Sequence, residues 1–332
     1  MVQNKIIVNS GKVNEYLHHI DLKEFGKEKI LSCYVCEFDD YSIFLDCGTS
    51  LEIKRTLNYC EDNQINLSKF KYLITTHHHF DHNGGLWLLY EKLKQNNPNF
   101  KIITNPLTKN LLNNFEDHLS RAKRTFGTFI GEMRSIENKA FKLIEPIDNF
   151  PISDNNYSPV DTFYKNGEKF ELVIFKTPGH TPDHQCIVLI KNGVIDSLFL
   201  GEAAGTVYHS TELITMPTSM PVYYNHQNYM ESLHKLQKLK GINLAGFCHF
   251  GLVSGSRYIH KLLKNHEDFM REFRNKIIAY YKEKPETRYI YKKIYPFLTS
   301  RTDLMGNEHP IMKNIVLGVI YGMMMDLGYR KE

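Results

Sequence analysis

The sequence predicts an α/β protein in which two mixed β-sheets pack against each other and helices cover their outer faces. Segments with the period or composition of strands outnumber helical segments, and the two kinds interleave along the chain. Residues with metal-binding chemistry follow several of these strands directly. The chain has 332 residues, 42% of them hydrophobic, which is enough to bury a substantial core.

The individual elements follow from periodicity and turn signals. Seven alternating or apolar runs predict strands, at residues 30–38, 42–46, 70–75, 101–104, 170–176, 185–190 and 197–201. Three further runs predict helices, at residues 51–63, 86–95 and 224–239. We find no internal repeat or low-complexity linker in the sequence, so one continuous fold is expected.

A helical insertion is expected over about residues 105–150. Within it, residues 107–137 carry apolar side chains with a helical rhythm, which Gly127 and Gly131 interrupt. Three interpretations are open for this segment: a lid over a site, a dimer surface, or an ordinary packing helix.

The end of the chain is also expected to be helical. From Arg257 onward apolar residues recur at helical spacing, and Gly328 suits a left-handed cap on the last helix. We therefore expect one domain over residues 1–255 and a helical C-terminal region over residues 256–332. The most apolar stretch, 311–327, contains charged residues and falls short of a membrane span, so no membrane partner is expected.

A dense histidine cluster follows the apolar run 72–74. Residues 76–85 read Thr-His-His-His-Phe-Asp-His-Asn-Gly-Gly, which places two imidazoles, a carboxylate and a third imidazole at His77, His79, Asp81 and His82. Neutral imidazole is the commonest protein metal ligand, and carboxylate also suits borderline cations. The spacing His-x-His-x-Asp-His therefore predicts a metal site.

Three later residues are candidates for the same site. His180 lies in a Pro- and Gly-rich turn after the strand expected at 170–176, and Glu202 follows the apolar run that ends at Gly201. His249 follows a short apolar segment at 244–247. Because loops carry functional residues on a rigid scaffold, we expect these side chains to join the histidine cluster.

The motifs and their order along the chain resemble those of the metallo-β-lactamase superfamily over about residues 28–255. Two smaller matches support this: residues 44–48 resemble the strand and turn ahead of the first helix, and residues 83–85 resemble the turn after the histidine cluster. The resemblance implies an αβ/βα sandwich, a catalytic domain over residues 1–255, and a hydrolase of the broad branch that includes glyoxalase II and lactonase relatives.

The resemblance also assigns the metal ligands. It implies two divalent transition-metal ions, zinc in first place and iron or manganese as alternatives. The first metal would be held by His77, His79 and His180, the second by Asp81, His82 and His249, and Glu202 would bridge the two. The bridging residue is usually Asp, and the extra methylene of Glu202 moves its carboxylate by about 1.5 Å. Either the Glu202 backbone is set back or the second site is altered, and a single-metal enzyme is the alternative.

The cysteines are expected to be reduced thiols. The six cysteines come without a recognisable secretory signal at the N-terminus, which favours a cytoplasmic location. Cys33 and Cys36 form a CxxC pair on a strand-like segment, so they should face opposite sides and pack in the core. Cys248 is next to His249 on an extended segment, so we expect it to point away from the metals.

The polar residues around the ligands have their own expectations. His78 alternates with its neighbours and should point away from the metals. His184 is close enough to His180 to support it, although a loop or core hydrogen bond is favoured. Tyr208 and His209 follow Glu202 closely and are candidates to reach a substrate.

The expected chemistry is hydrolysis by a metal-bound hydroxide that Asp81 helps to orient. We expect a small-molecule substrate, an ester, thioester, lactone or amide, and a homodimer is a further expectation. A β-lactamase role is disfavoured by the helical C-terminal region and the absent secretory signal.

Three alternatives stay open. A phosphodiesterase or nuclease would use the same metals and would bind nucleic acid through segment 257–301, which has twelve Lys or Arg against five Asp or Glu. We favour a solvated helix face for that segment. A di-iron redox or oxygen-binding protein is disfavoured because flavodiiron proteins usually have Glu where this chain has His79. A non-catalytic sensor would keep the ligands and lose access to them.

Overall fold

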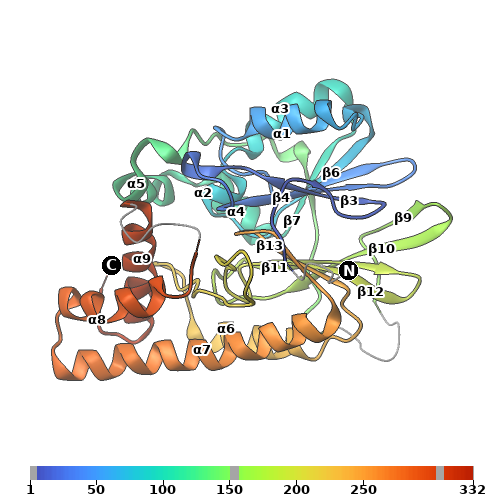
Figure 1. Cartoon of the computed structure of the whole chain (residues 1–332). Coiled ribbons are helices and arrows are strands. Elements are labelled where there is room, and N and C mark those ends of the chain that lie inside the picture. Colours follow the sequence, from blue (N-terminus) through green and yellow to red (C-terminus); the bar gives the residue numbers. More distant parts are fainter. Residues whose placement is uncertain (1–5, 150–156, 304–309, 332) are drawn as a thin grey trace.

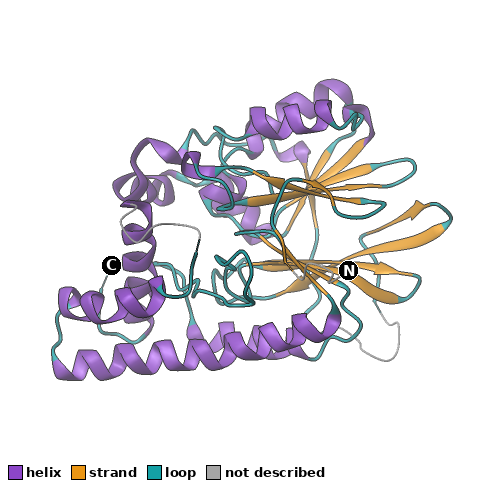
Figure 2. Cartoon of the chain, in the orientation of Figure 1, coloured by secondary structure: helices purple, strands orange, loops and turns teal. Residues whose placement is uncertain are grey.

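Two seven-stranded sheets pack face to face, and helices cover the outside of both (Figure 1, Figure 2). This architecture is that of a computed structural model, which describes residues 6–149, 157–303 and 310–331. It confirms the expected fold class of two mixed sheets flanked by helices, with a helical C-terminal extension. The expectation that the N-terminus carries no secretory signal concerns residues 1–5, which lie outside the residues that the structure describes.

The N-terminal sheet contains four of the expected strands. Its order is β2 (Gly11–Lys12), β3 (Leu17–Asp21), β4 (Ser32–Glu37), β5 (Ser42–Leu45), β6 (Phe70–Ile74), β7 (Lys101–Thr104) and β8 (Phe141–Leu143). Strands β5 to β8 pair in parallel and the others are antiparallel. Helices α1 (Ile53–Asp62) and α3 (Leu86–Asn96), both expected from the sequence, cover its outer face (Figure 1).

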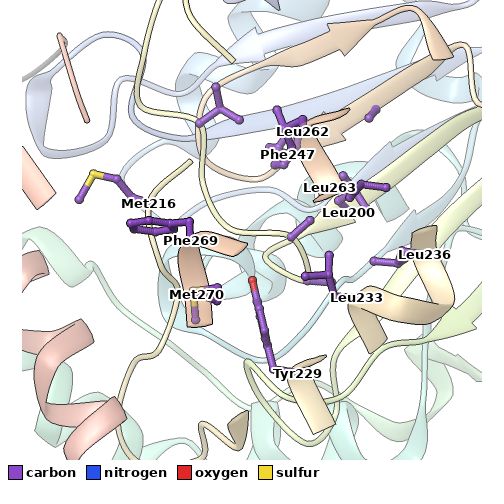
Figure 3. Packing of buried hydrophobic residues seen from close by; sticks show 14 of the residues in the cluster. Leu200, Met216, Tyr229, Leu233, Leu236, Phe247, Leu262, Leu263, Phe269 and Met270 are labelled. Atoms are coloured by element: carbon purple, nitrogen blue, oxygen red, sulfur yellow. The ribbon is translucent and has the colours of Figure 1, made fainter. Parts of the chain in front are cut away.

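The C-terminal sheet contains the other three strands expected from the sequence. Its order is β1 (Ile6–Ile7), β14 (Leu252–Ser254), β13 (Leu244–Phe247), β12 (Val194–Gly201), β11 (Gln185–Lys191), β10 (Glu168–Lys176) and β9 (Asp161–Lys165). Among the described strands of this sheet, only β12 and β13 pair in parallel. Helices α6 (His226–Gln237) and α7 (Ser256–Glu283) cover this sheet, and Figure 3 shows Leu233 of α6 and Leu263 of α7 close to Leu200 of β12.

The alternation of strand side chains separates the core into layers. On β4, Cys33 and Val35 belong to the core under α1 and α3, whereas Tyr34 and Cys36 belong to the core between the sheets. The expectation that the CxxC cysteines face opposite sides is therefore confirmed. All six cysteines are buried free thiols, so the sheet packs them as small apolar residues.

The insertion is less helical than its sequence rhythm predicts. It forms α4 (Pro106–Asn113) and α5 (Glu116–Phe126), followed by a short 3-10 turn, and the expected helix does not continue to residue 137. Gly127 and Gly131 adopt positive φ angles of 64° and 66°, which end the helical path. Apolar residues beyond them are still buried, because an irregular segment can pack as well as a helix.

The C-terminal extension folds back over the molecule. After α7 it forms α8 (Thr287–Thr299) and α9 (Pro310–Asp326), and α9 packs against both α7 and α5 (Figure 1). Gly328 follows with a φ of 71°, which confirms the left-handed cap expected there. None of the helices in the described ranges has the length and apolarity needed to span a membrane.

Strand direction determines where the functional side chains meet. Strands β10 and β12 run in the same direction because both are antiparallel to β11, and β13 is parallel to β12. Their carboxyl ends lie at one edge of the sandwich together with the carboxyl end of β6. The segments that leave this edge carry His77, His180, Glu202 and His249.

Two glycines on α9 give a test of how closely this helix is docked. A Cβ at Gly322 would lie 1.9 Å from the carbonyl oxygen of Ser219, whereas one at Gly318 would lie 2.8 Å from the flexible side chain of Met220. We expect Gly322→Ala to lower the free energy of unfolding by about 1–3 kcal/mol, because a backbone clash outweighs the better helix propensity of Ala. Gly318→Ala should change it by less than about 1 kcal/mol. Equal effects of the two variants in urea unfolding would show that α9 is not docked through Gly322.

Candidate metal centre

Four buried side chains bring their donor atoms together at the strand ends. One nitrogen or oxygen each of His77, His79, His180 and Glu202 lies within 4.8 Å of the others. They come from the loop after β6, the residue that precedes α2 (Phe80–Asn83), the loop after β10 and the residue after β12. Segments more than a hundred residues apart thus build one group of ligand atoms.

A second group lies beside the first. Donor atoms of Asp81, His82 and His249 are within 4.8 Å of one another. The Oδ2 atom of Asp81 is 3.4 Å from Nε2 of His82 and 3.4 Å from Nε2 of His249. The structure therefore brings all seven residues singled out in the sequence to one place.

Glu202 lies between the two groups. Its Oε2 atom is 3.3 Å from Nε2 of His77 and 2.7 Å from Nε2 of His180 in the first group. The same atom is 3.2 Å from Nε2 of His82, and Oε1 is 3.9 Å from Nε2 of His249 in the second. One carboxylate is thus within reach of ions at both positions.

These separations fit metal coordination. In a tetrahedral ion with bonds of about 2.0–2.1 Å, neighbouring ligand atoms are about 3.3–3.4 Å apart. The distances from Glu202 to His77 and His82 are close to this value. Nε2 of His77 is also buried with no hydrogen-bond partner in the described part of the chain, and a buried lone pair of that kind is costly without a ligand. The residues present therefore fit divalent cations of borderline softness.

Hydrogen bonds on the far side of three rings prepare their Nε2 atoms for binding. Nδ1 of His180 donates to the carbonyl oxygen of Thr218 at 2.6 Å, and Nδ1 of His249 donates to that of Ile30 at 2.9 Å. Nδ1 of His77 lies 3.0 Å from the hydroxyl of Thr76. A ring that donates through Nδ1 keeps its Nε2 lone pair free, which is the tautomer a metal requires.

The pKa shifts keep most of these side chains in the protonation state that binds a metal, which is a neutral imidazole or an ionised carboxylate. Burial, reinforced by neighbouring imidazoles, lowers the pKa of His77 and His79 well below the usual value, so both rings are neutral. Burial opposes the ionisation of Asp81, but His82 and His249 outweigh it and hold the pKa of that carboxyl below its usual range. Burial alone would lower the pKa of His82, but the neighbouring carboxylates of Asp81 and Glu202 outweigh burial and raise this pKa to about 9. A cation at this position would replace that proton as the partner of the carboxylates.

The backbone holds Glu202 in place. The pairing of β12 with β13 shifts register between Phe199 and Gly201, and Gly201 has a φ of 55°. The N–H of Glu202 donates to Nε2 of His184 at 3.0 Å, and its carbonyl accepts from the hydroxyls of Thr218 and Tyr229 at 3.0 and 3.2 Å. The longer side chain of Glu202 thus starts from a locally irregular backbone and still reaches both ligand groups.

Several polar residues lie next to the proposed ligands without belonging to the two groups. Nδ1 of His78 lies 2.9 Å from Oδ1 of Asp183, and a donor atom of His78 also lies within 4.8 Å of donor atoms of His79 and His118. The thiol of Cys248 lies 3.0 Å from Oδ2 of Asp46, so it packs behind the ligands. The same carboxylate of Asp46 accepts from the backbone and hydroxyl of Thr76, which makes it an anchor of the histidine loop.

An apolar pocket opens over the donor atoms. Residues of α5, the loop 217–222 and α9 line it, so the insertion does lie over the candidate metal centre. Its free volume is about 150 Å³, which is room for a group of about the size of benzene. Tyr208 lines this pocket, whereas Nδ1 of His209 lies 3.6 Å from Asp303 at the protein surface.

His118 is a pocket residue that sequence reasoning missed. It lies on α5, its ring stacks on that of His79 at 5.2 Å between centroids, and its Nε2 accepts the N–H of Phe80 at 3.3 Å. Burial lowers its pKa to about 3, so the ring is neutral. No motif surrounds His118, and only the packing of α5 over the histidine loop brings it here.

Comparisons with known proteins agree with this geometry. The family model described as "Metallo-beta-lactamase superfamily" matches residues 27–243, which is more than half of the chain. None of the curated proteins matches.

Three solved structures share the fold. A metallo-beta-lactamase superfamily protein from Sulfolobus tokodaii is 25% identical, with a TM-score of 0.55 over 77% of this chain and 86% of its own. A metallo-beta-lactamase family protein from Thermus thermophilus is 12% identical, with a TM-score of 0.56 over 90% and 89%. A metallo-beta-lactamase from Cronobacter sakazakii is 11% identical, with a TM-score of 0.51 over 81% and 95%.

The two ligand groups predict the metal content. We expect close to two transition-metal ions per chain in elemental analysis of protein purified without oxygen, because seven ligands are too many for one tetrahedral ion. His249→Ala should reduce the content toward one, since it removes a ligand of the second group alone. One ion in the parent protein, together with an unchanged content in His249→Ala, would rule out the second site.

The bond from Glu202 to His184 predicts an effect on metal affinity. His184→Phe keeps a ring at this position but removes the acceptor of the Glu202 N–H, so metal should bind about 10–100-fold more weakly in chelator competition. His234→Phe is the matched control, because His234 lies on α6 and pairs with Glu267 instead. If both variants bind metal equally well, His184 only fills space.

Proposed function

The chain belongs to the metallo-beta-lactamase superfamily, and from this premise we propose that it is a binuclear metal-dependent hydrolase of small molecules. The observation that carries the proposal is the position of Glu202, one buried carboxylate within reach of two groups of ligand atoms at the base of an apolar pocket. We assign the first ion to His77, His79 and His180, and the second to Asp81, His82 and His249. Zinc is the ion we favour, with iron or manganese as alternatives.

The ligands would support hydrolysis without a protein nucleophile. Two divalent ions held here would act as Lewis acids and lower the pKa of a bound water toward about 7. Asp81 lines the pocket and is the residue we expect to orient that water, since its Oδ2 atom lies in the second ligand group, 3.4 Å from Nε2 of His249, and a carboxylate oxygen can accept a hydrogen bond from the water. Neutral His118 also lines the pocket beside His79 and can form a hydrogen bond with a substrate or leaving group.

The pocket favours a small acyl substrate. Its walls include Phe80, Phe126 and Val319, and its free volume suits a short hydrocarbon or ring. We therefore propose an ester, thioester, lactone or amide, as in the glyoxalase II and lactonase branch of the superfamily. Action in the cytoplasm agrees with six buried free thiols, and a homodimer remains part of the proposal.

In this proposal the two regions of the chain act together. We keep a catalytic domain over residues 1–255 and a helical region over residues 256–332. Asn314, Ile315 and Val319 of the helical region line the pocket, so both parts would contribute to substrate binding.

The basic C-terminal segment gives little support to a nuclease. Several of its cations pair with acids of the same helix: Lys264 with Glu267 at 3.0 Å and Lys276 with Glu272 at 3.3 Å. In both pairs the lysine remains in contact with solvent, as on a solvated helix face. We therefore treat the phosphodiesterase and the di-iron redox protein as alternative functions that the experiment below can detect.

A substrate panel tests the proposal. We expect the metal-loaded protein to hydrolyse at least one short ester, thioester, lactone or amide, and to lose this activity with a chelator. Glu202→Gln should cut turnover and metal content together, because a neutral amide is a poorer ligand than a carboxylate. A variant with Lys282, Lys284, Lys292 and Lys293 changed to Gln should stay within about threefold of the parent on the small substrate.

Two other results would redirect the assignment. Cleavage of RNA or DNA by a parent that ignores every small substrate, with a weaker salt dependence in the lysine variant, would establish the phosphodiesterase. Oxygen consumption by an iron-loaded protein that hydrolyses nothing would establish the redox alternative.

A further inference from the structure

Glu24 is a buried acid that the metal centre does not use. It lies in the turn between β3 and β4 and lines the pocket together with Phe25, His79 and Asp81. Its exposed fraction is 0%. Neither of its carboxyl oxygens has a hydrogen-bond partner among the residues that the structure describes.

An unpartnered carboxyl in such a place costs folding free energy. Burial raises the pKa of Glu24 well above its usual value, and the carboxylates of Asp81, Glu52 and Glu202 raise it further. Glu52 is a useful contrast, because it is also buried but accepts from the N–H and hydroxyl of Thr49. The protein thus satisfies one buried acid internally and leaves the other to face the pocket.

The turn that carries Glu24 is clamped to the insertion. The ring of Phe25 stacks on Phe126 at 5.6 Å between centroids and meets Phe129 edge-on at 5.6 Å. These contacts join the turn to the end of α5 and to the 3-10 turn that follows it, and Phe25 and Phe126 both line the pocket. Glu24 is therefore held at the pocket wall by the packing of the residue next to it.

We propose that Glu24 recognises an N–H group of the substrate, an amine or an amide, by accepting its hydrogen bond. A carboxyl group keeps an acceptor oxygen whether it is ionised or protonated, so this role does not depend on its protonation state. The inference deepens the proposed hydrolase function and rests on it: the acyl part would lie along Phe126, Ile315 and Val319 while the nitrogen meets Glu24.

The first readout is the midpoint of thermal unfolding. Replacing an acid that only stabilises the fold would lower this midpoint, whereas replacing an unpartnered acid should raise it. Glu24→Leu should raise the midpoint of thermal unfolding of the metal-loaded protein by a few degrees, since it replaces an unsatisfied carboxyl by an apolar group of similar size. Glu52→Leu is the matched control and should lower it, because it breaks the bonds to Thr49. A midpoint that falls equally in both variants would overturn the proposal.

Substrate preference is the second readout. The probes are the 4-nitrophenyl esters of hexanoic, 6-acetamidohexanoic and 6-aminohexanoic acid. The kcat/KM of the nitrogen-bearing esters relative to the plain ester should fall about tenfold in Glu24→Leu, mainly through KM. Glu24→Gln should recover the acetamido ester, because its carbonyl still accepts a bond, and the amino ester less well. An unchanged ratio in Glu24→Leu would overturn the proposal.

A binding experiment tests the role of Glu24 independently of the proposed hydrolase activity. If the parent hydrolyses no ester, the function assignment is in error, and calorimetry with n-hexylamine and N-hexylacetamide still decides the role of Glu24. Binding that weakens about tenfold in Glu24→Leu and not in Glu52→Leu supports it. Equal binding to parent and Glu24→Leu, or equal weakening in both variants, overturns it.

Discussion

The buried carboxylate of Glu202 is the constraint on which the rest of the site depends. Three imidazole nitrogens lie 2.7 to 3.3 Å from its Oε2 atom: those of His77 and His82 come from the segment after β6, and that of His180 comes from the loop after β10. A buried charge is tolerated only when it is paired, so these segments must meet at one edge of the sandwich. The hydrogen bonds behind Glu202, to His184, Thr218 and Tyr229, then keep the carboxylate where both ligand groups can share it.

The C-terminal extension is physically connected to this centre. The hydroxyl of Tyr229 contacts the carbonyl of Glu202 on one side and Nε2 of His266 on α7 at 2.8 Å on the other. Burial lowers the pKa of His266 to about 3, so this ring is a neutral hydrogen-bonding group inside the core. Helix α9 adds part of the pocket wall, and its close contact at Gly322 leaves no room for a side chain. The extension therefore both supports the backbone of the site and encloses the space above it.

The pocket combines two kinds of surface with different roles. Its base is made of imidazoles and carboxylates in positions typical of metal ligands, and its walls are mainly apolar. Apolar walls select by shape and give weak discrimination between similar chains, whereas a buried polar group rejects ligands that leave it unpaired. Glu24 and His118 are polar groups on these walls outside the ligand set, so we expect them to contribute to specificity.

Local features of this chain could be predicted from the sequence alone. Period-two alternation predicted the main strands and the opposite orientation of Cys33 and Cys36, and the His-x-His-x-Asp-His spacing with three later residues predicted which side chains meet. These features depend on the geometry of a strand or a turn, which a few adjacent residues determine. Tertiary structure alone decided how Glu202 reaches both ligand groups and that Glu24 and His118 face the pocket. Each of those outcomes depends on contacts between segments far apart in the chain, and such contacts leave no periodic or spacing signal in the residues that make them.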